Sequence, residues 1–381
     1  MRVLQVINKP VRIATGGGDS RTQALDQFID SIGGARVVVQ NEAWQKSRIY
    51  RQTRPLSLLG QIRRARPEAL VVRYPGFPFF WRHDRNLELA RAHAFLRLLR
   101  RLTRRIGCRA IVDILDLLRY PSPNPDLALR LSDRALAAFE RCLLQWADQV
   151  WACSHSIRSH LIDTYDLDQE KVAVVLNGGF RHGNPEPPPT IPRPCAPTFS
   201  FFYAGDLAPG WRGTEIMLDG FTRHVSDPAA RLVVCGVNGA WIEQAYPDRR
   251  ITNLGTLSAE QVAAAGRGCH VGLVPQPESG YYHLAFPTKV GLYLTLGLPV
   301  LTTRAREAAE FVETHGVGVA AQATRFGEAM RDLAADPGRL EPMRLRSASV
   351  GEGFYWDAIY RRAFDMFASR FADGEVTRCA A

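Results

Sequence analysis

The sequence lacks several features that would each have indicated a class of protein. It contains no run of about eighteen apolar residues, the length that a helix needs to cross a bilayer. The first residues, MRVLQVINKP, lack the long apolar stretch of a secretory signal peptide. Its seven cysteines are odd in number and have no CxxC spacing, which argues against a structural zinc site and favours a reducing compartment. These absences predict a cytoplasmic protein.

Motifs for cofactor, metal and nucleic-acid binding are also missing. Gly16, Gly17 and Gly18 end a loop between a predicted strand and a predicted helix, but the GxGxxG spacing of dinucleotide-binding proteins is absent. Asp113 and Asp116 have the wrong spacing for a DxD metal motif. No recognition motif accompanies the many arginines. We therefore expect no cofactor, no required metal and no nucleic-acid partner.

Length and composition predict a globular protein of two domains. The chain has 381 residues, of which 46% are apolar and 23% charged. Residues 1–188 hold 29 Lys and Arg against 18 Asp and Glu, so the net charge of +10 arises in the first half. This excess is nearly all arginine, which can reflect genome composition. As a functional feature, it indicates an anionic partner such as a membrane surface or a phosphorylated substrate.

The first half alternates between short apolar runs and helical patterns, which predicts a doubly wound β/α domain. The helix expected over 19–32 places Arg21 in its first turn, where an anion can bind. Asp113 and Asp116 end a predicted strand at the edge where such sheets bind ligands, although either carboxylate could instead cap a turn. The six expected strands are Arg2–Ile7, Arg36–Val39, Ala69–Arg73, Arg109–Leu115, Asp148–Ser154 and Lys171–Leu176.

A basic amphipathic helix is expected over Asn86–Ile106. One stripe is apolar, and the other holds five arginines: Arg97, Arg100, Arg101, Arg104 and Arg105. An aromatic loop at Tyr74–Trp81 precedes it. Together they could lie on an anionic membrane. Alternatively, the apolar stripe faces the sheet and the arginines are solvated.

A proline-rich crossing at 181–197 separates two β/α alternations, so we place one domain at 1–188 and the other at 189–353. An amphipathic helix over 354–371 follows, and we assign residues 354–381 to the first domain. Six strands are expected in the second half: Phe199–Gly205, Arg231–Gly236, Ile251–Gly255, His270–Gln276, Pro299–Thr303 and Gly316–Ala321. Its helices are expected near 213–224, 239–245, 258–266, 287–296, 305–314 and 323–335.

Two cations stand at predicted helix starts in this second half. Lys289 lies in the first turn of a helix opened by Pro287 and Thr288, and Arg212 directly precedes Gly213. Free backbone N–H groups and the positive end of the dipole at both places favour an anion, and two such sites could hold one diphosphate. An ordinary strand–helix unit with a surface lysine is the alternative. Glycine turns that allow close approach lie at Gly205 and at Gly236, next to Asn238.

The order of these motifs resembles the GT-B glycosyltransferases, and especially glycosyltransferase family 4 of bacterial surface-polysaccharide synthesis. The resemblance rests on VWACSHSIRSHL and VAVVLNGG in the first half, and on FFYAGDLAPGWRGTEIML, LVVCGVNG, NLGTLSAEQV and LAFPTKVGLYLTLGLPVLTT in the second. It implies two Rossmann-like domains facing a cleft, with the C-terminal helix crossing back to the first. It also implies an enzyme of class EC 2.4 that uses a nucleotide-sugar as donor.

The resemblance assigns roles to single residues. Arg212 and Lys289 match the residues that hold the donor diphosphate, and Asp116 matches an acceptor-side aspartate, so these three are the predicted catalytic residues. The donor-binding set is Gly205, Asp206, Arg212, Gly213, Gly236, Asn238, Glu278, Thr288 and Lys289. The acceptor-side set is Gly17, Gly18, Arg21, Asp113 and Asp116.

Three positions depart from the family pattern. Asp206 replaces an arginine, Leu115 replaces a histidine, and Leu292 stands where a glutamate normally binds the ribose hydroxyls. Glu278 could represent the upstream glutamate of the family's pair, although its loop is about seven residues longer than usual. A site without the ribose carboxylate suits a deoxyribose nucleotide, so one hypothesis is a dTDP-sugar such as dTDP-rhamnose, with UDP- and GDP-sugars also open.

The family usually retains anomeric configuration. Arg212, Lys289 and two helix dipoles would stabilise the leaving group, so no metal is required. The expected acceptor is a glycan, or a glycan linked to a polyprenyl diphosphate, reached from the inner face of the plasma membrane. A catalytically inactive nucleotide-sugar-binding or scaffold protein of the same fold is the alternative.

Overall fold

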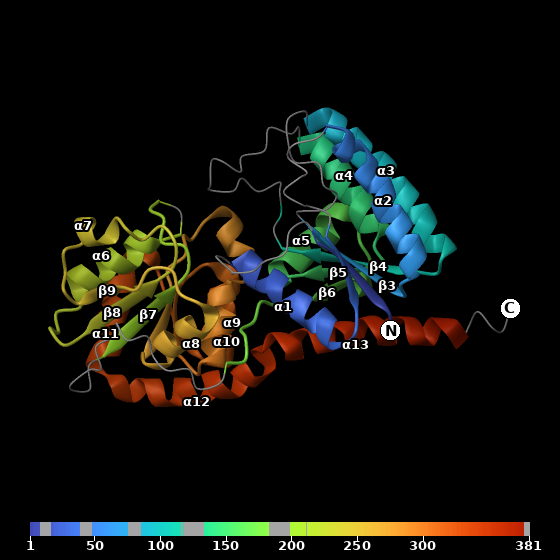
Figure 1. Ribbon diagram of the computed structural model, residues 1–381. Coiled ribbons are helices and arrows are strands. Elements are labelled where there is room, and N and C mark those ends of the chain that lie inside the picture. The colour runs from blue at the N-terminus through green and yellow to red at the C-terminus, as the bar shows by residue number, and fades with distance from the viewer. Residues whose placement is uncertain are drawn as a thin grey trace. The chain divides into compact units, whose positions relative to one another are not determined.

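The computed structural model describes residues 1–7, 17–38, 48–74, 85–115, 117, 133–182, 199–210 and 212–376. The chain forms two compact units. Unit 1 comprises 1–12, 25–175 and 363–381, and unit 2 comprises 13–24 and 176–362. Each unit is a parallel sheet with helices on both faces (Figure 1).

The sheet of unit 1 has the strand order β2-β1-β3-β4-β5-β6, and all its pairings are parallel. Strands β1, β3, β4 and β5 are buried almost throughout, as a sheet covered by helices on each side requires, whereas Ala35 and Arg36 of the edge strand β2 are exposed. The strands are β1 (Val3–Ile7), β2 (Ala35–Val38), β3 (Ala69–Tyr74), β4 (Arg109–Ile114), β5 (Gln149–Ala152) and β6 (Val172–Val174).

The helices of unit 1 form two layers. On one face, α2, α3 and α4 lie side by side (Figure 1), and the indole of Trp146 donates to the Thr103 hydroxyl at 3.4 Å. On the other face, Phe28 and Phe364 stack, and Trp151 meets Phe364 edge-on. The helices are α1 (Gly17–Ser31), α2 (Arg48–Ala65), α3 (Arg85–Arg105), α4 (Asp133–Trp146), α5 (His155–Tyr165) and the last part of α13 (Trp356–Val376).

The sheet of unit 2 has the strand order β12-β11-β10-β7-β8-β9, again all parallel. Its chain order reverses between β7 and β10, and such a switch point is where open α/β sheets bind ligands. The strands are β7 (Ser200–Ala204), β8 (Arg231–Cys235), β9 (Ile251–Asn253), β10 (Val271–Val274), β11 (Val300–Thr303) and β12 (Gly318–Ala321).

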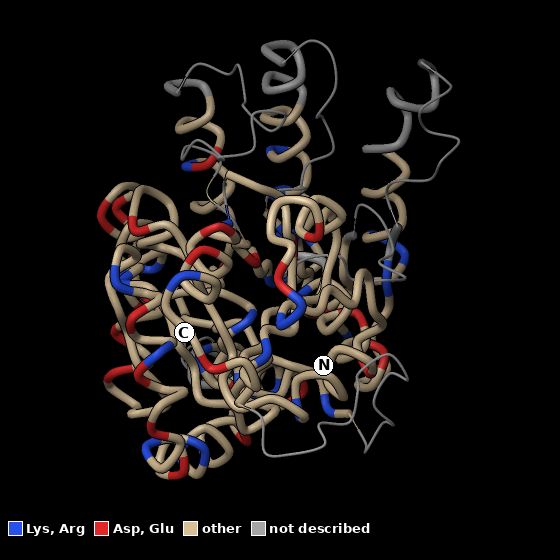
Figure 2. Tube along the Cα trace, turned by 90° about the vertical axis from the view of Figure 1, so that its left-hand side faces the viewer, with Lys and Arg blue, Asp and Glu red and all other residues tan. Residues whose placement is uncertain are grey.

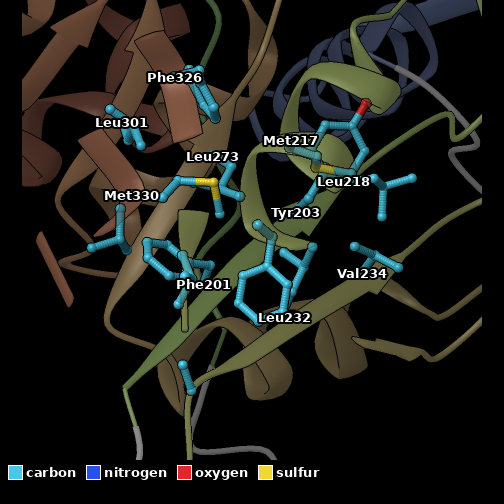
Figure 3. Close-up of a cluster of buried hydrophobic side chains, with 14 of the residues drawn as sticks. Phe201, Tyr203, Met217, Leu218, Leu232, Val234, Leu273, Leu301, Phe326 and Met330 are labelled. Carbon is cyan, nitrogen blue, oxygen red and sulfur yellow. The ribbon is translucent and has the colours of Figure 1, made fainter. Parts of the chain in front are cut away.

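Helices cover both faces of this second sheet. One face packs on α6 and α11 through the apolar cluster that Figure 3 shows, which includes Phe201, Leu273 and Met330. On the other face, Tyr293 of α9 packs edge-on against Phe202. The helices are α6 (Thr214–His224), α7 (Ile242–Ala245), α8 (Ala259–Arg267), α9 (Thr288–Thr295), α10 (Arg306–His315), α11 (Phe326–Ala335), α12 (Leu340–Gly351) and the first part of α13.

Helix α13 confirms the amphipathic pattern expected near the C-terminus. Trp356, Tyr360, Phe364 and Phe367 are all buried. The helix begins in unit 2 and ends in unit 1, as a helix that crosses back to the first domain must. Helix α1 is divided in the same way, between Ala24 and Leu25.

Several expected elements differ from the structure. Helix α12 was not expected, because its buried side includes Ser347 and Gly351 and therefore leaves no apolar stripe in the sequence. Helix α1 begins at Gly17, so Gly17 and Gly18 are helical rather than part of a loop. The helix expected near 239–245 has only four residues, Ile242–Ala245. The aromatic loop beyond Tyr74 lies outside the described residues.

Candidate functional site

Three glycines bring loops together at the switch point of unit 2. Gly205 follows β7 and Gly236 follows β8, and a Cβ on Gly236 would lie 1.6 Å from the Gly205 carbonyl oxygen. Gly213 is the N-cap of α6, with φ of +73°, and a Cβ there would lie 1.6 Å from the Pro275 carbonyl oxygen. Only glycine allows such close backbone approach, so these turns and the end of β10 form one cluster.

Lys289 reaches into this cluster from the first turn of α9. A Cβ on Gly205 would meet its Cε and Nζ at 2.7 Å, so the ammonium lies directly against that turn. Its Nζ also lies 4.8 Å from the centroid of the Tyr203 ring. Among the described residues Lys289 forms no ion pair, so its ammonium, held against an aromatic face, is available to an anionic ligand.

The environment lowers the pKa of Lys289 to about 7. Burial is the main cause, and the positive charge of Arg212 adds to it, while Asp206 acts in the opposite direction. Some surface of Lys289 stays exposed, so a ligand can reach it. The two predicted diphosphate residues are therefore close enough to repel each other, and an anion between them would relieve that repulsion.

Asp206 is held by its own loop. Its Oδ1 accepts hydrogen bonds from Asn238 Nδ2 at 2.9 Å and from the Ala208 backbone N–H at 3.0 Å. The Tyr203 hydroxyl donates to the Asp206 carbonyl at 2.9 Å. Asn238 adopts a left-handed conformation, with φ of 61°, which lets its side chain point back to this carboxylate. Asp206 therefore stabilises the turn and partly offsets the two cations.

Both helices at the site begin without a side-chain cap. The N-cap residues are Gly213 for α6 and Pro287 for α9, and neither supplies a side-chain acceptor to the first turn. By contrast, Ser258 caps α8 with a capping box. Uncapped N–H groups at a helix start are donors for a phosphate, so Thr288 and the first turn of α6 fit the predicted role.

The carboxylate of Glu278 accepts hydrogen bonds that the sequence did not predict. Its Oε1 accepts from the backbone N–H groups of Arg304 at 2.8 Å and Ala323 at 2.9 Å, which ties the loop after β10 to the ends of β11 and β12. The His283 ring adds a contact to the Glu278 carbonyl oxygen at 2.9 Å. Oε2 has no hydrogen-bond partner in the described part of the chain, so this oxygen can still serve a ligand.

Two tyrosines at the site were not predicted. Tyr203 lies beneath the ammonium of Lys289. Tyr282 is buried in the loop after β10, and the charges of Arg212 and Asp206 both influence its phenol, whose pKa burial raises. Tyr203 lies two residues before the Gly205 turn, a spacing that could have indicated it. The position of Tyr282 depends on the fold of its loop.

Arg21 lies in unit 2, together with the donor-side residues. It is fully buried, it donates to Asn177 Oδ1 at 3.1 Å, and its guanidinium lies 5.9 Å from the Trp356 ring centroid. Asn177 in turn donates to the Phe286 carbonyl at 2.7 Å, next to the start of α9. Arg21 thus supports the segment that carries Lys289. Acceptor contact by Arg21, Gly17 or Gly18 stays a prediction.

The structure describes only one of the two predicted acceptor-side aspartates. Asp113 is completely buried in β4 and pairs with Arg73 of β3 at 3.1 Å, so its carboxylate stabilises the sheet of unit 1. Asp116 lies outside the described residues. Their roles toward an acceptor stay predictions. The described residues contain no cluster of three or more His, Cys, Asp or Glu side chains that could hold a metal ion.

Comparisons with known proteins address the fold and the class. The model of the glycosyl transferase 4-like domain matches residues 10–178, and that of the glycosyl transferases group 1 matches residues 198–336. Together they account for both halves of the chain. This chain is a GT-B glycosyltransferase.

Solved structures support the same fold. Sucrose-phosphate synthase from Thermosynechococcus elongatus superimposes with a TM-score of 0.70 at 14% identity, over 98% of this chain and 100% of that one. The lipopolysaccharide outer core galactosyltransferase WaaB gives 0.61 at 14% identity, over 97% and 100%. WaaG, a glycosyltransferase involved in lipopolysaccharide biosynthesis, gives 0.62 at 11% identity, over 96% and 99%. Curated protein sequences include no significant match to this glycosyltransferase.

The described helices of the glycosyltransferase include none that is both long and apolar enough to cross a membrane.

Proposed function

We propose that the enzyme transfers a sugar from a nucleotide-diphosphate donor to a glycan acceptor, and that unit 2 binds the donor. The observation that carries this proposal is the placement of Lys289 against the Gly205 turn, with Arg212 nearby, at the switch point of the sheet. Two cations and two uncapped helix starts suit the diphosphate that leaves when the glycosidic bond forms.

The reaction needs charge stabilisation more than covalent help from the protein. The acceptor oxygen forms a bond to the anomeric carbon while the bond to the diphosphate oxygen breaks, and the electron pair leaves with the diphosphate. Lys289 and Arg212 stabilise that charge. We propose a retaining, metal-independent course in which a diphosphate oxygen takes the acceptor proton and Asp116 orients the acceptor. Product stereochemistry by NMR tests the first point, and activity with excess EDTA the second.

Substitutions test whether Lys289 and Arg212 bind the diphosphate and whether the neighbouring Asp206 does not. Lys289→Ala and Arg212→Ala are expected to reduce turnover more than Asp206→Ala, because Asp206 stabilises the turn but carries the wrong charge for a phosphate. Near-normal turnover in both cation variants would remove the diphosphate assignment. Hydrolysis of a nucleotide-sugar without acceptor gives a second readout and distinguishes an active enzyme from an inactive binding protein.

For the donor we propose a dTDP-sugar, with dTDP-rhamnose as one example. Leu292 offers no carboxylate to ribose hydroxyls, and a deoxyribose lacks the 2′-hydroxyl that would need one. A thermal-shift screen followed by titration with dTDP, UDP and GDP tests this choice. The dTDP hypothesis fails when UDP or GDP binds at least as tightly as dTDP.

For the acceptor we propose a growing surface glycan, or a glycan on a polyprenyl diphosphate, at the inner face of the plasma membrane. The printed names of WaaB and WaaG place those two enzymes in lipopolysaccharide synthesis. Unit 1 adds a basic surface at the ends of α2 and α3, among the positions marked blue in Figure 2. Its exposed arginines, none of which pairs with a described acid, are Arg63, Arg64, Arg66, Arg97, Arg100, Arg101, Arg104 and Arg105.

Such a surface attracts anionic lipids, and the attraction is screened by salt. Sedimentation with vesicles of phosphatidylcholine and phosphatidylglycerol is expected at low salt and not at high salt. Vesicles of phosphatidylcholine alone serve as the control. Equal sedimentation with both kinds of vesicle, or with neither, would remove the membrane as a partner of this surface.

A further inference from the structure

Gln276 lies at the switch point of the sheet and belongs to none of the predicted binding sets. It lies two residues beyond the end of β10, directly after Pro275, whose carbonyl oxygen packs against the N-cap Gly213 of α6. The Thr303 hydroxyl donates to the Gln276 carbonyl at 2.6 Å and fixes its backbone. Gln276 is therefore held beside the start of α6, a helix of eleven residues that begins directly after Arg212 and Gly213.

The side chain of Gln276 is buried without a partner. The residue is 9% exposed, and its Oε1 has no hydrogen bond within the described residues. A buried amide oxygen that accepts nothing carries a desolvation penalty. Its retention at a ligand-binding edge of the sheet indicates an acceptor that a bound molecule satisfies.

Glu278 presents a second open acceptor two residues later. Its Oε1 is occupied by the backbone N–H groups of Arg304 and Ala323, which fixes the carboxylate, while Oε2 has no such partner. Two neighbouring acceptors require two donors on the ligand. A pyrimidine-dione base offers one N–H, whereas a sugar ring offers several hydroxyls, so the chemistry of the pair favours a sugar ring over a base.

We propose that Gln276, with Glu278, binds ring hydroxyls of the donor nucleotide-sugar and helps to determine which sugar the enzyme accepts. This inference rests on the proposed donor site and extends it from the diphosphate to the sugar. Both the transferred glycosyl unit and the ribose carry suitable hydroxyls. Gln276 is a specificity residue here, because its amide neither carries charge to the leaving group nor moves a proton.

The test uses calorimetric titration of the full-length protein. The ligands are UDP, 2′-deoxy-UDP, UDP-glucose, dTDP, dTDP-glucose, GDP and GDP-mannose, and the variant is Gln276→Met, which keeps the size and removes both polar atoms. Gln244→Met, on the exposed side of α7, is the matched control. For the nucleotide-sugar that the wild type binds best, Gln276→Met is expected to weaken binding about tenfold or more, because Glu278 is left as the only open acceptor of the pair.

Binding of the parent nucleoside diphosphate distinguishes the hydroxyls of the glycosyl unit from those of the ribose. Unchanged binding of the corresponding nucleoside diphosphate assigns Gln276 to the glycosyl unit. Weaker UDP binding with unchanged 2′-deoxy-UDP binding assigns it to the ribose. The melting temperature of Gln276→Met is expected to equal or exceed that of the wild type, because an unsatisfied buried acceptor is replaced by an apolar group. A purely structural amide would instead make this variant less stable and leave binding intact.

Three results would overturn the inference. Unchanged affinity for every ligand shows that Gln276 contacts none of them. An equal loss for all ligands, including 2′-deoxy-UDP and dTDP, shows that the amide serves a part that every ligand shares, and neither the glycosyl unit nor the 2′-hydroxyl. Failure of the wild type to bind any nucleotide removes the donor site, and with it this inference. Lys289→Met distinguishes failure of this inference from failure of the proposed donor site, because it should weaken the binding of nucleoside diphosphates as well as that of nucleotide-sugars.

Discussion

Binding of a nucleotide-sugar should take up a proton at Lys289. In the free protein its pKa is about 7, because burial and the neighbouring Arg212 both disfavour the charged amine. A diphosphate placed between Lys289 and Arg212 brings negative charge to the ammonium and raises that pKa again. Near pH 8 the amine is therefore mostly neutral before binding and charged afterwards, so affinity must fall as pH rises above 7.

The size of the effect follows from the two pKa values. With a free pKa of about 7, and a bound pKa restored to the ordinary lysine value of roughly 10.4, the dissociation constant rises about fivefold from pH 7 to pH 8 and about ninefold from pH 8 to pH 9. Between pH 7 and pH 9 this amounts to about fiftyfold, or roughly 2.3 kcal/mol. At pH 8 about 0.9 of a proton should be taken up per ligand bound. A nucleotide-sugar is the better ligand here, because its diphosphate is esterified at both ends and has no proton that titrates near pH 6.

Calorimetric titration at pH 7, 8 and 9, in pairs of buffers with different ionisation enthalpies, measures both quantities. Lys289→Met should bind weakly and lose the pH dependence over this range. Lys171→Met is the matched control, because burial also lowers the pKa of Lys171, but Lys171 lies in unit 1. A constant affinity from pH 7 to pH 9, with no proton uptake, would refute the reasoning. It would mean that Lys289 is already charged or does not meet the phosphates.

Three further predictions concern stability and are checked by thermal and denaturant unfolding. Gly213→Ala should destabilise unit 2 by about 3 kcal/mol or more, since the new Cβ would lie 1.6 Å from the Pro275 carbonyl oxygen. Gly210→Ala is the control: its φ is also positive but no atom lies within 4 Å of the new Cβ, so it measures the cost of the backbone conformation alone. Arg73→Leu should cost about 3–5 kcal/mol because it removes the guanidinium that pairs with the buried Asp113, and adding Asp113→Asn should recover part of this. Asn177→Ala should cost about 2–3 kcal/mol and raise KM for the donor, since it removes the hydrogen bonds to Arg21 and Phe286 beside the start of α9, whereas unchanged stability would show that these bonds contribute nothing.

The sequence predicted the two β/α alternations because buried parallel strands are short apolar runs bounded by glycine and proline. Val271–Val274, closed by Pro275, is one example. It did not predict the strand orders, because parallel pairing joins segments far apart in the chain. It also missed α12, whose buried residues Leu340, Ser347 and Gly351 form no apolar stripe. Periodicity detects a helix only where the buried face is made of large apolar side chains.

The candidate site was predictable in part for the same kind of reason. Glycine turns and cations at helix starts are local patterns, so Gly205, Arg212 and Lys289 were found from spacing and resemblance. The ring of Tyr203 beneath Lys289 and the backbone groups that hold Glu278 were not, because these contacts join different loops. The open amide of Gln276 is a property of packing that no spacing records.

The division of the chain has a consequence for protein engineering. Neither unit is one continuous segment: unit 1 needs residues 363–381 from the far end of the chain, and unit 2 needs residues 13–24 from near its start. A chimera with another glycosyltransferase cannot be made by a single exchange in the proline-rich crossing. Such an exchange would give unit 1 a foreign Phe364 against its own Phe28 and Trp151. Donor specificity should therefore be transplanted by exchanging both segments of unit 2, 13–24 and 176–362, together, with junctions at 12–13, inside α1, at 175–176 and inside α13.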